Sequence, residues 1–155
     1  MKNINIVLLF ATIMLFSFCK KPGPIIISNS VDIRLVNQQS QNLLTPPTTL
    51  NESNIDVFYL SNGNATLFYK SSADFPKGFK IFNPDGQESL KLFSNDADED
   101  FPVTIIKFGT YKADTLKCQV SRKNNSRIMN KLWLNGVLKF DAENRIGSES
   151  ITIVK

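Results

Sequence analysis

The stretch IDVFYLSNGNATLFYK, residues 55–70, carries the strongest fold signal in the chain. Two runs of aromatic and β-branched residues flank Asn62-Gly63. An Asn-Gly pair between such runs predicts a β-hairpin, because a type I′ turn requires positive φ at both central residues. With this turn setting the register, Tyr59 faces Thr66 on one side of the hairpin. The pair of Phe58 and Leu67 then lies on the other side, so both faces are apolar.

The rest of the chain repeats this pattern of short apolar runs separated by turn residues. Several of these runs alternate apolar and polar residues with period two, which is typical of strands with one buried face. No segment after residue 18 predicts a helix of ten residues. Nine or ten short strands favour an all-β domain, an immunoglobulin-like antiparallel β-sandwich over residues 31–155. The irregular segment 38–54 is expected to cross between the sheets. The runs are VDIRLV (31–36), GFKIF (78–82), ESLKLF (88–93), VTIIKF (103–108), DTLKCQVS (114–121), IMNKLWL (128–134), VLKF (137–140) and SITIVK (150–155).

The N-terminus predicts export. Residues 6–18 contain no charge, and this run of 13 residues is short of the about 20 that a spanning helix needs. No pair of small residues marks an ordinary cleavage site, but Cys19 follows directly. The segment LFSFC (15–19) resembles a bacterial lipobox, from which Phe18 departs. We therefore predict a signal peptide over 1–18, and a lipidated cysteine with a tether over 19–30. The alternative is an uncleaved anchor in which Cys19 plays no part.

Composition excludes several kinds of chemistry. The chain of 155 residues contains no histidine, which removes the usual Ser-His and Cys-His nucleophile pairs and His-ligated zinc. Outside residues 1–18, which contain only Lys2, 17 basic side chains stand against 14 acidic ones. This small excess argues against a nucleic-acid partner. Of the two cysteines, Cys118 lies in a predicted strand, where we expect a buried apolar side chain rather than a reactive thiol.

The acidic side chains give one weak metal candidate. Asp96, Asp98 and Asp100 have the 1-3-5 spacing of an EF-hand loop, so calcium is the only cofactor to consider. Phe101 occupies the position of the invariant glycine, and Lys107 the position of the bidentate glutamate. A solvated acidic loop is therefore favoured over a calcium site. The remaining acids lie near strand ends and select no catalytic pair, so we expect no enzyme.

Three aromatic side chains are candidates for ligand binding. Trp133 is expected to pair with Leu138 across the turn at Asn135-Gly136, and Tyr59 and Tyr69 belong to the first hairpin. Exposed Trp and Tyr on a sheet stack on sugars or fill partner pockets. The alternative, which is the commoner one, is packing in the core or beneath a loop.

The chain resembles the small envelope lipoproteins of unknown function that are abundant in Bacteroidota-type bacteria. The residues that carry the likeness are the junction Cys19-Lys20-Lys21, the segment IRLVNQQSQNLLTP (33–46), and the closing KLWLNGVLKF (131–140) and ITIVK (151–155). The resemblance implies a β-sandwich held by palmitate or a similar acyl chain on Cys19, and Lys20 favours sorting to the outer membrane. It supplies no catalytic residues.

Together these observations predict a non-enzymatic lipoprotein whose partners are the membrane, through its lipid, and a protein or glycan. A calcium-stabilised adhesion or structural domain and a small glycan-binding module are the alternatives.

Overall fold

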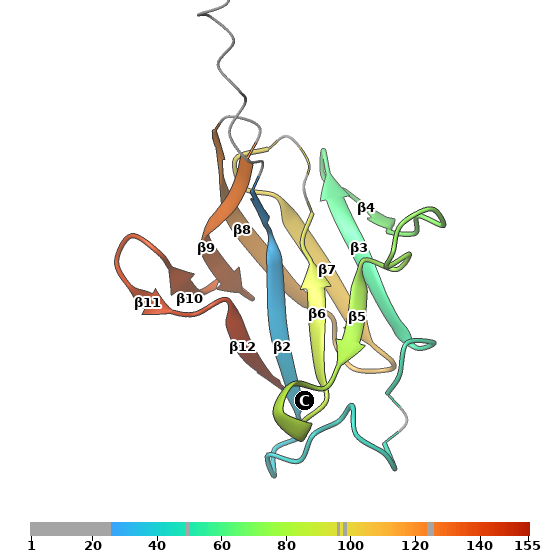
Figure 1. Ribbon diagram of the computed structural model, residues 1–155. Helices are drawn as coiled ribbons and strands as arrows, with labels where there is room; N and C mark the ends of the chain where they lie inside the picture. Colours follow the sequence, from blue (N-terminus) through green and yellow to red (C-terminus); the bar gives the residue numbers. More distant parts are fainter. Residues whose placement is uncertain (1–25, 49, 96, 98, 124–125) are drawn as a thin grey trace, which may run out of the picture.

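The computed structural model describes residues 26–48, 50–95, 97, 99–123 and 126–155. Within these ranges the chain is all-β, with a single 3₁₀ turn at Pro84–Gly86 and no α-helix. Two sheets pack face to face, as Figure 1 shows. The prediction of an all-β sandwich dominated by antiparallel pairing is therefore confirmed.

The larger sheet has the strand order β11-β10-β9-β8-β7-β3-β4, and β1 pairs with β9 outside this path. All neighbours along the path are antiparallel, whereas β1 and β9 are parallel. Its strands are β1 (Ile27–Ser28), β3 (Ile55–Ser61), β4 (Asn64–Leu67), β7 (Val103–Phe108), β8 (Asp114–Lys123), β9 (Ser126–Leu134), β10 (Val137–Asp141) and β11 (Ile146–Gly147).

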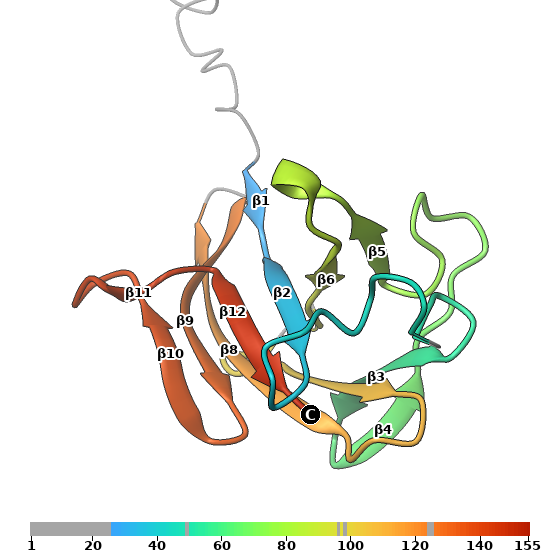
Figure 2. The ribbon, with the colours of Figure 1, turned by 90° about the horizontal axis from the view of Figure 1, so that it is seen from below.

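The smaller sheet covers one face of the larger one and has the order β12-β2-β6-β5. Figure 2 shows β12, β2 and β6 running across the larger sheet. The strands are β2 (Ser30–Val36), β5 (Phe79–Phe82), β6 (Ser89–Phe93) and β12 (Ser150–Val154). The last strand, β12, pairs in parallel with β2, which lies near the start of the described chain. Segments from the two ends of the domain are therefore neighbours in this sheet.

The two Asn-Gly turns have the backbone that the sequence predicts. Asn62 and Gly63 have φ of 50° and 79°, and Asn135 and Gly136 have φ of 50° and 84°. The predicted pairs form in both hairpins, Tyr59 with Thr66 and Trp133 with Leu138. The register therefore follows from the positive φ that these turns demand.

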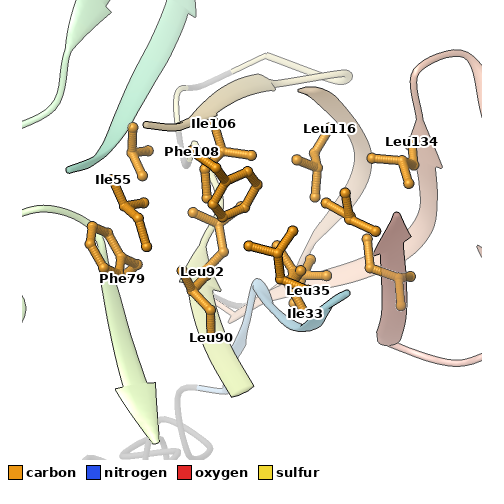
Figure 3. Close-up of a cluster of buried hydrophobic side chains, with 14 of the residues drawn as sticks. Ile33, Leu35, Ile55, Phe79, Leu90, Leu92, Ile106, Phe108, Leu116 and Leu134 are labelled. Atoms are coloured by element: carbon orange, nitrogen blue, oxygen red, sulfur yellow. The ribbon is translucent and has the colours of Figure 1, made fainter. Parts of the chain in front are cut away.

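The core lies between the sheets, because each strand turns alternate side chains inward. Figure 3 shows Phe108, Ile106 and Leu116 of the larger sheet facing Leu35, Leu90 and Leu92 of the smaller one. The side chains that are completely or almost completely buried include Val31, Ile33, Leu35, Ile55, Val57, Leu90, Leu92, Ile106, Phe108, Leu116, Met129 and Leu132.

The segment 38–54 crosses from β2 to β3, as expected, and so changes sheets. Leu44 is buried and Leu43 packs against the core from the side. The start of the crossing is fixed by Asn37, whose side-chain oxygen accepts hydrogen bonds from the N–H groups of Gln39 and Gln41. Such local bonds to an Asn side chain favour a turn over a continuing strand.

Residues 26–30 belong to the sandwich, although the sequence places them in the tether. The N–H of Arg127 donates to the carbonyl of Ile26 at 2.8 Å, and Ile27 pairs with Arg127 in the parallel ladder of β1 and β9. This pairing is available because β10 covers β9 only from Lys131 onward. A free edge on a neighbouring strand, which the sequence does not reveal, therefore recruits the β-branched residues of this segment.

Candidate functional site

Several predicted site residues lie outside the part of the chain that the structure describes. These are Cys19, Asp96 and Asp98, so lipidation and calcium binding stay predictions. Asp100 is exposed on the loop between β6 and β7, and its backbone carbonyl accepts from the N–H of Val120. Among the described residues no group of three or more Asp, Glu or Cys side chains is close enough to hold a metal ion.

Tyr59 is a structural residue. Its ring packs against the core and lies 4.4 Å, between centroids, from the ring of Phe68. Its hydroxyl donates a 2.9 Å hydrogen bond to the carbonyl of Phe93, at the end of β6 in the other sheet. Tyr59 thus joins the two sheets and fills the interior, as the commoner reading of the sequence expects.

Trp133 lies on the outer face of the larger sheet and is half-buried. The ring of Phe101 meets it edge-on at 6.2 Å, and the Nζ of Lys117 lies 5.7 Å from its ring and 4.7 Å from that of Phe101. Trp133 belongs to one cross-strand row that runs over six strands: Ala65, Leu60, Val103, Lys117, Trp133 and Leu138. The outward apolar residues Leu60 of the first hairpin and Trp133 and Leu138 of the second therefore lie in one row on this face.

Tyr69 is the one of the three candidates whose side chain is mostly in solvent, with 67% of its surface exposed. It follows β4 and lies beside a groove of about 510 Å³ between residues 69–77 and strand β5. Its lining includes Tyr69, Phe75, Lys77, Phe79, Lys80 and Ile81. We call this the Tyr69–β5 groove. The structure does not bring Trp133 or Tyr59 to it.

One wall of the Tyr69–β5 groove is the open edge of strand β5, which pairs with β6 on its other side. The N–H of Phe93 donates to the carbonyl of Gly78, which makes 78 and 93 a hydrogen-bonded pair. In an antiparallel ladder, hydrogen-bonded pairs alternate with pairs that are not hydrogen-bonded. Lys80, two residues after Gly78, therefore also bonds to β6, whereas Phe79 and Ile81 direct their N–H and C=O groups away from β6. In the described part of the chain no group bonds to these four backbone atoms.

The opposite wall, residues 69–77, is held by specific contacts. Lys77 donates from Nζ to the carbonyl of Glu52 at 2.7 Å, and Phe75 stacks on Phe93 at 5.2 Å. Gly78 ends the wall with φ of +77°, where an added Cβ would lie 2.8 Å from Cδ1 of Phe68. Lys77 also donates to the carbonyl of Ile55 in β3 at 3.4 Å, so the wall is held to the crossing segment and to both sheets, and the groove is preformed.

Two of the acidic side chains near strand ends, Asp114 and Asp141, form ion pairs within the fold. Asp114 forms an ion pair with Lys155, with 2.5 Å between Oδ2 and Nζ. Asp141 accepts from Asn144 at 2.8 Å and lies 3.0 Å from Nζ of Lys131. The side-chain bond from Asn144, followed by that from Lys131, lowers the pKa of Asp141 to about 2. A carboxyl group with so low a pKa is ionised near neutral pH and does not serve as a general acid there.

Cys118 is fully buried, as predicted, with 0% of its surface exposed. Burial raises the pKa of its thiol to about 11, against a smaller opposing effect of the hydrogen bond with Ser94. Because only the thiolate is nucleophilic, Cys118 is chemically inert near neutral pH.

We expect Cys118 to resist thiol reagents in the folded protein. In a Cys19→Ala variant it is the only cysteine, so Ellman's reagent at pH 8 should detect no thiol in native protein and one thiol per chain after denaturation. Full reaction within minutes at pH 8, before unfolding, would contradict the buried position.

No helix in the described ranges is long and apolar enough to cross a membrane. Comparison of the chain with protein-family models, with curated proteins and with solved structures gave no match. Function must therefore be inferred from the geometry of this chain and from its N-terminal sequence.

Proposed function

We propose that this chain is a non-enzymatic lipoprotein of the cell envelope, in which a lipid on Cys19 anchors a β-sandwich that binds a partner. The observation that carries the binding role is the Tyr69–β5 groove, where an exposed aromatic side chain faces an open strand edge. Preformed concave sites with a few directed polar groups are typical of binding surfaces.

The position of the groove supports an anchored binding domain. The described chain begins beside the β8–β9 hairpin, where the N–H of Ile26 donates to Oγ of Ser126. The groove lies on the β4 and β5 side of the sandwich, which is another part of the molecule (Figure 1). Residue 26, where the described chain begins, therefore lies away from the groove, which supports a role in which the partner and the membrane meet different surfaces.

The non-enzymatic part of the proposal rests on how the acids are used. Asp114 and Asp141 are engaged in ion pairs and hydrogen bonds, and the only described cysteine is buried. Such groups stabilise the fold and are not available to a substrate.

A glycan is the second candidate for the groove, because a tyrosine ring as exposed as that of Tyr69 can stack on a sugar. The calcium-stabilised alternative depends on Asp96 and Asp98, outside the described residues, and remains a sequence prediction.

The anchor is tested by growing cells that express the full chain with an alkyne analogue of palmitate. Wild type should incorporate the label and partition with the membrane fraction, whereas Cys19→Ala should lose all label. Cys118→Ala serves as the matched control and should be labelled like wild type, since Cys118 is buried. Absence of label from the wild type, or equal label in Cys19→Ala, would overturn the lipid anchor.

A further inference from the structure

We propose that the Tyr69–β5 groove binds an extended peptide segment of a partner protein, which adds to the smaller sheet as a fifth strand beside β5. The inference deepens the binding role proposed above by naming the class of partner. It does not depend on the lipid, so the two proposals can fail separately.

The backbone of β5 supplies the main attraction. Phe79 and Ile81 present two N–H donors and two C=O acceptors along the open edge, with no partner among the described residues. These groups are spaced as in any β-ladder, and a strand laid beside β5 would satisfy all four. Four residues of added strand would extend over roughly 13 Å, which matches the length of β5 itself.

Side chains on both walls supply the selectivity. Phe79 is buried, but Ile81 is only half-buried, so the inner face of β5 is incompletely covered at this edge. An added strand would point every second side chain to this inner side, where Ile81 and Tyr69 could contact it. We therefore expect a segment with apolar or aromatic residues at alternate positions.

The groove is shaped for a single segment rather than for a second copy of the chain. Residues 69–77 form its far wall, and Lys77 and Phe75 are fixed by their contacts with Glu52 and Phe93. Edge-to-edge pairing of two sheets would bring a whole second sheet against this wall, whereas a single added strand needs only the space beside β5. A glycan, for its part, would use the Tyr69 ring but would have no use for a regular row of backbone donors and acceptors.

The test selects random heptapeptides displayed on phage against the immobilised full chain in detergent, and then measures the affinity of the selected peptide in synthetic form. Ile81→Pro removes an outward N–H and no bond to β6, and proline is tolerated on an edge strand. Tyr69→Ala changes an exposed side chain. We expect each variant to bind roughly tenfold more weakly.

The matched control is Thr152→Pro, at the open edge of β12 on the other side of the same sheet. The carbonyl of Glu149 and the N–H of Lys155 both bond to β2. Successive residues of a strand direct their backbone groups to opposite sides, so Thr152, an odd number of residues from each, directs its N–H and C=O away from β2. This variant should bind like wild type. Should Ile81→Pro fail to fold, hydrogen exchange of wild type gives the same information, because bound peptide should protect the amides of Phe79 and Ile81.

Four outcomes would overturn the proposal. The first two are that no peptide is enriched and that all variants bind the selected peptide equally. The third is that the chain forms a dimer that Ile81→Pro abolishes. The fourth is that the chain binds glucose or N-acetylglucosamine oligosaccharides, and that Tyr69→Ala abolishes this binding whereas Ile81→Pro leaves it intact. None of these results bears on labelling of Cys19, so the lipid anchor would stand or fall by its own experiment.

Discussion

Replacing Asp114 by alanine is expected to lower the free energy of unfolding by about 3–5 kcal/mol, the range found when one partner of a buried ion pair is removed. The carboxylate lies 2.5 Å from Nζ of Lys155, and each side chain has only 8% of its surface exposed. Asn135 also donates to Oδ1 of Asp114 at 2.9 Å. The variant would leave the Lys155 ammonium buried, with the carbonyl of Lys112 as its one hydrogen-bond partner among the described residues.

The expected loss follows from where the pair lies. Asp114 begins β8 in the larger sheet, and Lys155 directly follows β12 in the smaller one. Nζ of Lys155 also lies 5.7 Å from the ring of Phe108, in the core. The ion pair therefore ties the last strand of the smaller sheet to the interior of the larger one.

Urea denaturation followed by circular dichroism measures this loss, provided that the transition is two-state. The matched control is Asp114→Ala combined with Lys155→Met, which removes both charges and keeps an apolar stem. It should recover part of the lost stability, since no buried charge is left without its partner. A loss below about 1 kcal/mol in Asp114→Ala, typical of an exposed ion pair, would show that the pair is not buried.

The parts of the fold that were predictable from sequence depend on local chemistry. Asn62-Gly63 and Asn135-Gly136 fix their own φ angles, and each turn then fixes which residues pair in its hairpin. Period-two alternation also identified inward positions such as Cys118 within β8, because a strand has only two faces.

The pairing of strands distant in sequence was not predictable in the same way. The parallel ladder of β2 and β12 joins residues near the two ends of the domain, and no turn sets its register. The short strand β1 forms because part of the β9 edge is left free by β10. Both depend on which edges remain open after the other strands have paired, and this is a property of the whole sheet.

The candidate site shows the same limit. Tyr59 and Tyr69 lie in one hairpin sequence, yet Tyr59 joins the two sheets through its hydroxyl while Tyr69 faces solvent. The turn places Tyr59 on one face of the hairpin, but it does not place Tyr69, because β4 ends at Leu67 and the N–H of Lys70 bonds to the carbonyl of Pro76 instead of continuing the ladder. Phe79 and Ile81 had no sequence signal as site residues.

Phe108→Ala is expected to destabilise the protein by about 3–5 kcal/mol, because truncating a buried aromatic side chain removes its burial and leaves a cavity. Phe108 has no exposed surface and lies on the inner face of the larger sheet, between the two layers (Figure 3).

The matched control is Phe58→Ala on the outer face of the same sheet. Phe58 is half-buried and pairs with Leu67 and Ile105 of neighbouring strands. Its truncation should cost only about 1 kcal/mol, since part of its surface is in water already. Urea midpoints of the two variants, compared at equal m-value, measure the difference between the faces. Equal losses would mean that the outer face is as deeply covered as the inner one, and a two-layer sandwich with its core between the sheets would then be wrong.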